Sequence, residues 1–189
     1  SGSYRLSLTV TSDMGCIDTL SSQVNVYTMP IAAIYFNSDS VQCLNGNEFI
    51  VSDSTLNGVG RNWDFGNGAQ DTALQSRNKY NTSGNYTITL IVNNAGGCKD
   101  TATRNVVVHK NPVATVQASG SLVFCEGKNV TLTASGGLKF QWQKNKTDLP
   151  SATDSVLVVS ASGDYRSVVT DANACSDTAS ALSISVTPL

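Results

Sequence analysis

The sequence predicts an all-β protein built from small antiparallel β-sandwiches arranged in tandem. Ser and Thr alternate with Val, Ile and Leu along much of the 189 residues, which is typical of half-buried strands. No stretch carries apolar residues at helical spacing over three turns. Part of the chain also recurs within it, so more than one module of the same kind is present.

The internal repeat relates residues 2–19 to residues 84–101 without a gap. The matched pairs include Tyr4 with Tyr86, Cys16 with Cys98, Asp18 with Asp100, Pro30 with Pro112 and Cys43 with Cys125. A looser third copy lies at residues 163–178 and contains Cys175. We therefore expect residues 1–29 to be the C-terminal hairpin of a truncated module, followed by one sandwich at 30–111 and another at 112–189. Because a two-stranded hairpin is marginal in water, its partner strands must lie upstream or come from another molecule.

The charge and hydropathy patterns exclude several classes of partner. The formal net charge is -2 and no Lys/Arg run is present, which argues against binding to nucleic acid or to an anionic membrane. No run approaches the roughly 20 apolar residues that cross a bilayer, so we expect no membrane insertion by this segment. The chain does not open with a secretion signal, so the signal of a secreted protein would lie elsewhere in a longer chain.

The stretch 30–111 is expected to form seven short strands with Gly or Asn turns between them. We expect these strands near residues 31–36, 49–51, 61–65, 71–74, 79–81, 86–92 and 101–108. Trp63 and Phe65 should point to one face and fill the core. Gly66 and Gly68 would permit positive φ in the turn that follows.

The motif NWDFGNG at 62–68, together with Tyr80, the strand GNYTITL and Gly97-Cys98, resembles the PKD-like domain of bacterial surface proteins. The resemblance covers the whole stretch 30–111. The hallmark of that family is a W-x-F-G-D-G turn, and this sequence has Asn67 where aspartate is usual.

The stretch 112–189 resembles the immunoglobulin-like modules found beside PKD-like ones. The resemblance rests on VTLTASGG at 130–137, FQWQKN at 140–145 and SGDYRS at 162–167. It implies that Trp142 is the core tryptophan and Tyr165 the tyrosine-corner residue. Ala134 and Ser167 stand where an antibody-type domain has its disulfide pair. The predicted fold class is thus tandem seven-stranded antiparallel immunoglobulin-like β-sandwiches, with Trp63 and Trp142 in the cores rather than exposed as platforms for sugars.

Five cysteines, no C-x-x-C motif and a single histidine favour disulfides over zinc, and hence an oxidising compartment. Pairing within modules would join Cys43 to Cys98 and Cys125 to Cys175, leaving Cys16 alone. In a seven-stranded sandwich, however, those loops lie at opposite ends, roughly 23 Å apart, whereas a disulfide needs about 4.4 to 6.8 Å between α-carbons. End-to-end stacking of modules would instead place Cys43 beside Cys175. The other three cysteines would then have partners outside this chain, or none.

Catalytic and metal-binding patterns are largely missing, and we predict no enzyme activity and no cofactor. His109 is the only histidine and lies at the end of a strand, so we expect it to be solvated rather than catalytic. The run 64–68 with Asp71 could offer oxygens to calcium, but Asn67 weakens the charge there. A glycine turn is the favoured interpretation.

Aspartate followed by Ser or Thr and then by an aliphatic residue or Thr occurs seven times, which resembles the O-glycosylation acceptor pattern of Bacteroidota. The candidate acceptors are Thr19, Ser40, Ser54, Thr72, Thr101, Ser155 and Thr178. An alternative is that Asp-Thr simply follows the repeated cysteine at the start of a strand. That alternative explains Thr19, Thr101 and Thr178 but leaves the other four matches.

These resemblances imply a stalk segment of a large secreted cell-surface adhesin, of the gliding-motility type that the type IX secretion machinery of Bacteroidota exports to the outer membrane. Its partners would be the neighbouring repeats of the same chain, the secretion machinery, and a surface glycan or protein bound through distal domains. A second interpretation is an accessory region of a secreted protease or polysaccharide-degrading enzyme. A third is that the exposed faces themselves bind a glycan.

Overall fold

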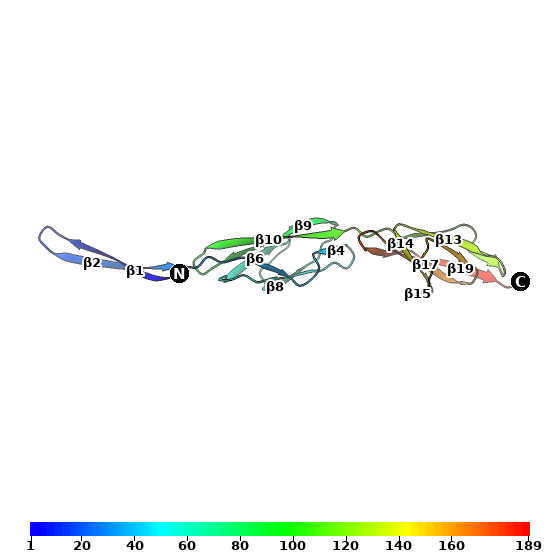
Figure 1. Cartoon of the computed structure of the whole chain (residues 1–189), viewed down its shortest axis with the longest axis horizontal. Helices are drawn as coiled ribbons and strands as arrows, with labels where there is room; N and C mark the ends of the chain where they lie inside the picture. The colour runs from blue at the N-terminus through cyan, green and yellow to red at the C-terminus, as the bar shows by residue number, and fades with distance from the viewer. The chain divides into compact units, whose positions relative to one another are not determined.

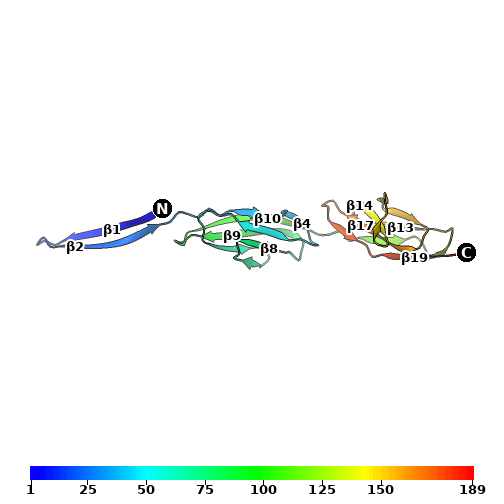
Figure 2. The same cartoon turned by 90° about the horizontal axis from the view of Figure 1, so that it is seen from below.

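The protein is all-β: the computed structural model describes residues 1–189 and contains nineteen strands and no helix. The chain divides into two compact units, which Figures 1 and 2 let the reader follow by colour along the sequence. The first unit comprises Ser1–Gln42, Asn47–Tyr80 and Asn85–Val107. The second comprises Cys43–Gly46, Asn81–Gly84 and Val108–Leu189.

The first unit begins with a two-stranded antiparallel hairpin made of β1 (Gly2–Thr11) and β2 (Ile17–Val26). Tyr4 lies opposite Val24 and Leu8 opposite Leu20, so the apolar residues of both strands share one face. Each strand is the only sheet partner of the other, and no third strand lies beside the hairpin (Figure 1). Residues 2–26 therefore form a two-stranded hairpin in the structure.

The remaining strands of the first unit belong to two sheets. One sheet has the order β4-β10-β9-β6-β7 and the other the order β3-β5-β8. The strands are β3 (Ile34–Phe36), β4 (Val41–Cys43), β5 (Phe49–Asp53), β6 (Gly60–Asp64), β7 (Gln70–Asp71), β8 (Gln75–Asn78), β9 (Gly84–Asn93) and β10 (Lys99–His109). The last residues of β4 and β10 fall in the second unit.

Aromatic side chains fill the core of the first unit. Trp63 and Phe65 are buried, as their alternation predicts. The ring of Tyr80 meets Phe49 of β5 edge-on at 5.4 Å and stacks on Tyr86 of β9 at 3.9 Å between ring centroids. This one ring therefore connects a strand of each sheet.

The strand boundaries in this stretch differ from the sequence prediction in two places. The structure adds β4, and it replaces the strands expected at 71–74 and 79–81 by the two-residue β7 and by β8. The inward positions of β8 are Ser76 and Asn78, both buried polar residues, so its sequence lacks the alternation of apolar and polar residues that marks a strand. The stretch thus has eight strands instead of seven.

The second unit is also built from two sheets. One has the order β11-β13-β16, and the other has the order β12-β19-β17-β14-β15 with β18 also paired to β17. Their strands are β11 (Thr115–Ala118), β12 (Val123–Cys125), β13 (Val130–Ser135), β14 (Lys139–Lys144), β15 (Thr147–Asp148), β16 (Val156–Val159), β17 (Gly163–Thr170), β18 (Ser176–Thr178) and β19 (Leu182–Thr187). All pairs with a described register are antiparallel except β12 with β19, which is parallel.

Two features that the sequence predicts for this unit are present. Trp142 is fully buried at the centre of a cluster that includes Leu132 and Ile184. The hydroxyl of Tyr165 donates to the backbone oxygen of Ala161 at 3.0 Å, which is the bond that defines a tyrosine corner.

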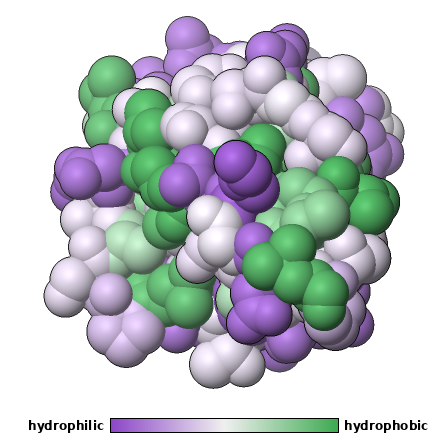
Figure 3. All heavy atoms as spheres, turned by 90° about the vertical axis from the view of Figure 1, so that its right-hand side faces the viewer, coloured by the Kyte–Doolittle hydropathy of each residue, from purple (hydrophilic) through white to green (hydrophobic).

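One face of the molecule is mixed in polarity. On the face shown in Figure 3, hydrophobic residues form small groups separated by hydrophilic ones. Scattered groups of this kind are normal on protein surfaces. The structure contains no helix long and apolar enough to cross a membrane.

Candidate functional site

A disulfide between Cys43 and Cys175 is the most distinctive chemical feature of the chain. Cys43 ends β4, Cys175 directly precedes β18, and their α-carbons lie 5.5 Å apart although 132 positions separate them in sequence. This is the pair that end-to-end stacking of the modules brings together in the sequence analysis, and it is not either of the within-module pairs. Cys175 is fully buried, whereas Cys16 and Cys125 are exposed thiols and Cys98 is a half-buried one.

The turn before Cys175 is held by the side chain of Asp171. Its Oδ1 accepts hydrogen bonds from the backbone N–H of Asn173 and of Cys175, both at 2.9 Å. The N–H of Asp171 in turn donates to the carbonyl of Cys175 at 2.9 Å. Ala174 has φ of 62°, a left-handed conformation that residues other than glycine adopt rarely. The network therefore fixes the direction of the cysteine side chain.

The same turn recurs before Cys98. The Oδ1 of Asn94 accepts from the N–H of Cys98 at 2.9 Å and from that of Gly96 at 3.0 Å. The N–H of Asn94 donates to the carbonyl of Cys98 at 3.0 Å. Gly97, at the position of Ala174, has φ of 81°.

The third copy of the turn precedes Cys16. Here the Oγ of Ser12 accepts from the N–H of Cys16 at 3.1 Å, and the N–H of Ser12 donates to the carbonyl of Cys16 at 2.8 Å. Gly15 has φ of 80°. The three cysteines thus occupy one kind of turn, and only the copy at Cys175 is cross-linked.

The other half of the disulfide also has a structural copy. The N–H of Leu44, directly after Cys43, donates to the carbonyl of His109 at 2.8 Å, and His109 is the last residue of β10. The N–H of Glu126, directly after Cys125, donates to the carbonyl of Thr187 at 2.9 Å, and Thr187 is the last residue of β19. Cys43 and Cys125 therefore sit at equivalent places beside a final strand.

Asn111 reaches both flanks of the disulfide. Its Oδ1 accepts from the N–H of Asn45, and its Nδ2 donates to the carbonyl of Ser176, both at 2.8 Å. Asn45 and Ser176 lie two residues and one residue beyond the two cysteines. The amide side chain therefore holds the chain on either side of the bond in place.

The aspartates two residues after Cys98 and Cys175 have a structural role that bears on the glycosylation pattern. Asp100 accepts through Oδ2 from the N–H of Ala32 at 2.8 Å, and Asp177 accepts from the N–H of Ala114 at 2.9 Å. Hydrogen bonds from the backbone of Ala32 and Thr101 hold the pKa of Asp100 below its usual value. These contacts explain the aspartates of two of the seven Asp-Ser/Thr matches without a sugar.

The hydroxyl-bearing residues of the candidate glycosylation sites all reach the surface. The exposed residues are Thr19, Ser40, Ser54, Thr72, Thr101, Ser155 and Thr178. Exposure is a requirement for enzymatic modification, so the pattern remains a prediction that the fold permits.

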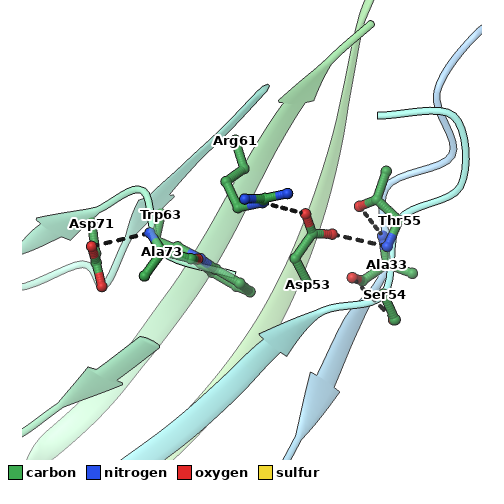
Figure 4. Close-up of polar contacts among 8 residues, drawn as sticks. All are labelled: Ala33, Asp53, Ser54, Thr55, Arg61, Trp63, Asp71 and Ala73. Carbon is green, nitrogen blue, oxygen red and sulfur yellow. Dashed lines mark hydrogen bonds and ion pairs between the residues drawn. The ribbon is translucent and has the colours of Figure 1, made fainter. Parts of the chain in front are cut away.

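The polar cluster drawn in Figure 4 stabilises the first unit. Arg61 contacts Asp53 at 2.8 Å, and Asp53 also accepts from the N–H of Thr55 (Figure 4). Burial raises the pKa of Asp53, but the hydrogen bonds from Thr55 and Arg61 outweigh this and lower it overall. The indole N–H of Trp63 donates to the carbonyl of Ala73 at 2.9 Å.

In the glycine turn after Trp63, side-chain oxygens of the turn accept hydrogen bonds from backbone N–H groups of the same turn. Asp64 accepts from the N–H of Gly66 at 2.8 Å and Asn67 from the N–H of Ala69 at 3.1 Å. Gly66 and Gly68 have φ of 72° and 87°, as the turn requires. No group of three or more His, Cys, Asp or Glu side chains gathers anywhere in the chain.

The structure also shows where the two tryptophans considered as sugar platforms and the single histidine lie. Trp63 and Trp142 are both buried, so neither offers a stacking face to a sugar. The indole N–H of Trp142 donates to the carbonyl of Asp154 at 2.9 Å. His109 is half-buried at the end of β10.

The side chains that shape the cysteine turns were not singled out from the sequence. Ser12, Asn94 and Asp171 each stand four residues before a cysteine, and all three are residue types that bond to nearby backbone N–H groups. Alignment of the three copies on their cysteines would have revealed this shared position.

In comparison with known proteins, residues 29–108 match the model of the PKD domain family. The PKD1 domain of Vibrio anguillarum Epp aligns with 45% of this chain and 99% of its own length at 26% identity, with a TM-score of 0.38. No curated protein sequence is significantly similar to the chain.

Two multi-domain structures align over more of the chain at lower identity. A 1.5-MDa bacterial ice-binding adhesin gives 13% identity over 98% of this chain and 74% of the other, with a TM-score of 0.44. The titin I-band fragment I67–I69 gives 18% identity over 86% of this chain and 67% of the other, with a TM-score of 0.45.

Proposed function

We propose that this chain is a non-catalytic, load-bearing stalk segment of a large secreted cell-surface adhesin, made of a PKD-like domain at 30–111 and an immunoglobulin-like domain at 112–189. The observation that carries the proposal is the disulfide between Cys43 and Cys175. It links Cys43 of the stretch 30–111 to Cys175 of the stretch 112–189 and closes most of both stretches into one covalent loop.

The loop changes how the chain responds to tension. When the two chain ends are pulled, force entering at Cys43 passes through the disulfide and leaves at Cys175. Residues within the loop cannot extend while the bond is intact, even if their hydrogen bonds break. Only the segments outside positions 43–175 can extend under tension. A stalk with this disulfide therefore limits how far the chain extends under load.

Single-molecule force spectroscopy on the chain held at its two ends tests the proposal. The loop spans a sequence separation of 132, and fully extended chain covers at most about 3.3 to 3.6 Å per residue. Reductant should therefore add about 450 Å to the total extension on unfolding. The triple variant Cys16→Ser, Cys98→Ser, Cys125→Ser is the control and should show the same gain. Equal extension with and without reductant would contradict the proposal.

The proposal places the chain outside the cell. A disulfide persists in oxidising surroundings, which fits a secreted protein. We further propose export by the type IX machinery of a gliding bacterium of the Bacteroidota, association with the outer membrane, and O-glycans on the seven exposed acceptors. Intact-mass measurement of natively produced protein tests the glycans, and a mass equal to that of the polypeptide would remove them.

The PKD domain match fits a second candidate equally well, namely an accessory region of a secreted protease or polysaccharide-degrading enzyme. The parent chain separates the two. Many further repeats would favour the adhesin, whereas a catalytic domain beside a few modules would favour the enzyme.

A further inference from the structure

We infer that the β1–β2 hairpin and the Cys98 turn together form a binding site for a polypeptide segment that has the same strand pattern as residues 30–82. In this site the strands cover the apolar face of the hairpin. The thiol of their cysteine, equivalent to Cys43, and the free thiol of Cys98 give up two protons and two electrons to a disulfide oxidant such as glutathione disulfide, which is reduced to two thiols, and the two sulfurs form one disulfide. The inference is independent of the stalk role.

The hairpin exposes one apolar face along its whole length. Tyr4, Leu6, Leu8 and Val10 alternate along β1, and between 53 and 64% of each residue is exposed. Leu20 and Val24 stand opposite Leu8 and Tyr4 on β2 and add to the same face. Contiguous apolar surface of this kind marks a binding surface.

The chain itself shows what covers such a face. At the repeat offset, Leu6, Leu8 and Val10 correspond to Ile88, Leu90 and Val92 of β9, all of which are fully buried. β9 pairs with β6, β10 pairs with β4, and the sheet β3-β5-β8 supplies the rest of the core. All of these covering strands come from residues 34–78. The matching occupant of the hairpin is therefore a second strand set of that design.

The end of the hairpin already lies against the Cys98 turn. The carbonyl of Thr28 accepts from Nδ2 of Asn94 at 2.6 Å. The Tyr27 ring lies so close to Gly96 that a Cβ there would clash with it. A pocket of about 310 Å³ opens beside these residues and is lined by Val26, Tyr27, Thr28, Asn94 and Ala95 among others.

The disulfide between Cys43 and Cys175 indicates which cysteine would pair with Cys98. Cys98 occupies the same turn as Cys175, whose partner is Cys43. The segment that carries Cys43 is anchored on the carbonyl of His109, and Tyr27 is the residue equivalent to His109 at the repeat offset. A strand set that completes the hairpin would therefore bring its own cysteine to the end of β2, next to Cys98.

The experiment adds the proposed occupant to the intact protein. A second copy of residues 30–82 is joined directly to Ser1, because Ser1-Gly2 aligns with Ser83-Gly84 and the native spacing is kept. Backbone amide exchange at Leu6 and Leu8 should slow at least about 100-fold, towards the rates at Ile88 and Leu90. Non-reducing peptide mapping should recover the added cysteine joined to Cys98. Free thiols should fall from the present three to two although one cysteine is added.

Two substitutions in the extended chain provide matched controls. Leu8→Asp lies on the apolar face and should abolish the protection of the hairpin, whereas Thr9→Asp lies on the opposite face and should leave it in place. Retention of the Cys43–Cys175 bond in both variants shows that the original part is folded.

Several outcomes would overturn the inference. Unprotected hairpin amides in the extended chain would do so, as would a free added cysteine or one joined to Cys16 or Cys125. A dimer of the unextended chain with a protected Leu8 amide would instead identify a second copy as the occupant. None of these results affects the force measurement, which depends on Cys43 and Cys175 alone.

Discussion

The hairpin β1–β2 and the hairpin β9–β10 carry the same pattern in two different environments. Leu8 is 64% exposed and its equivalent Leu90 is 0% exposed. Both stretches form a paired hairpin that ends in the same kind of cysteine turn. Burial depends on the partner strands, which only β9–β10 has within the described chain. The contrast shows that the module's stability comes from the sandwich as a whole rather than from its terminal hairpin.

Substitution of these two leucines by alanine should give the largest difference in unfolding free energy between the two hairpins. Leu90→Ala should lower the free energy of unfolding by about 2 to 5 kcal/mol, because it removes contacts and leaves a cavity. Leu8→Ala should change it by less than about 0.5 kcal/mol, since the side chain is exposed. Chemical denaturation of both variants measures the difference. Equal losses would mean that the hairpin face is buried in solution.

Substitution of the side chains that bond the cysteine turns should give the next largest difference in unfolding free energy. Asn94 is buried and bonds two backbone N–H groups and a carbonyl, whereas Ser12 is exposed. Asn94→Ala should cost about 1 to 3 kcal/mol of unfolding free energy, because buried donors and acceptors lose their partner. Ser12→Ala should cost less than about 0.5 kcal/mol. Thermal unfolding checks both, and the reverse order would show that the turns are not equivalent.

The pH dependence of stability tests the packing of Tyr80, whose ring stacks on Tyr86 of β9 in the buried hairpin. Burial raises the pKa of Tyr80 to about 12, while its hydroxyl donates to the carbonyl of Phe65 at 2.8 Å. A raised folded-state pKa means that the stabilisation is complete below pH about 10 and is lost as pH rises towards 12. The unfolding free energy should fall on the order of 2 kcal/mol over that range. Tyr80→Phe should remove most of this pH dependence, and an unchanged slope would contradict the assignment.

The sequence predicted the features that depend on local pattern. Long alternating strands such as β9 and the buried Trp63 and Trp142 follow from residue types at fixed spacing. The tyrosine corner at Tyr165 was implied by the resemblance to immunoglobulin-like modules. The three-residue β4 is too short to show a period. Strand β8 faces the core with polar residues, so it carries no hydrophobic signal.

The candidate site was predicted less completely. The sequence left two pairing schemes open and favoured Cys43 with Cys175, because strand length sets how far apart the loops of a sandwich lie. The turn bonds of Asn94 and Asp171 and the double contact of Asn111 depend on side-chain direction, which spacing alone does not give.

Non-reducing peptide mapping of the folded chain tests the central claim most directly. The account predicts a peptide pair joined through Cys43 and Cys175, with Cys16, Cys98 and Cys125 recovered as free thiols. Recovery of Cys43 joined to Cys98, or of Cys125 joined to Cys175, would contradict it.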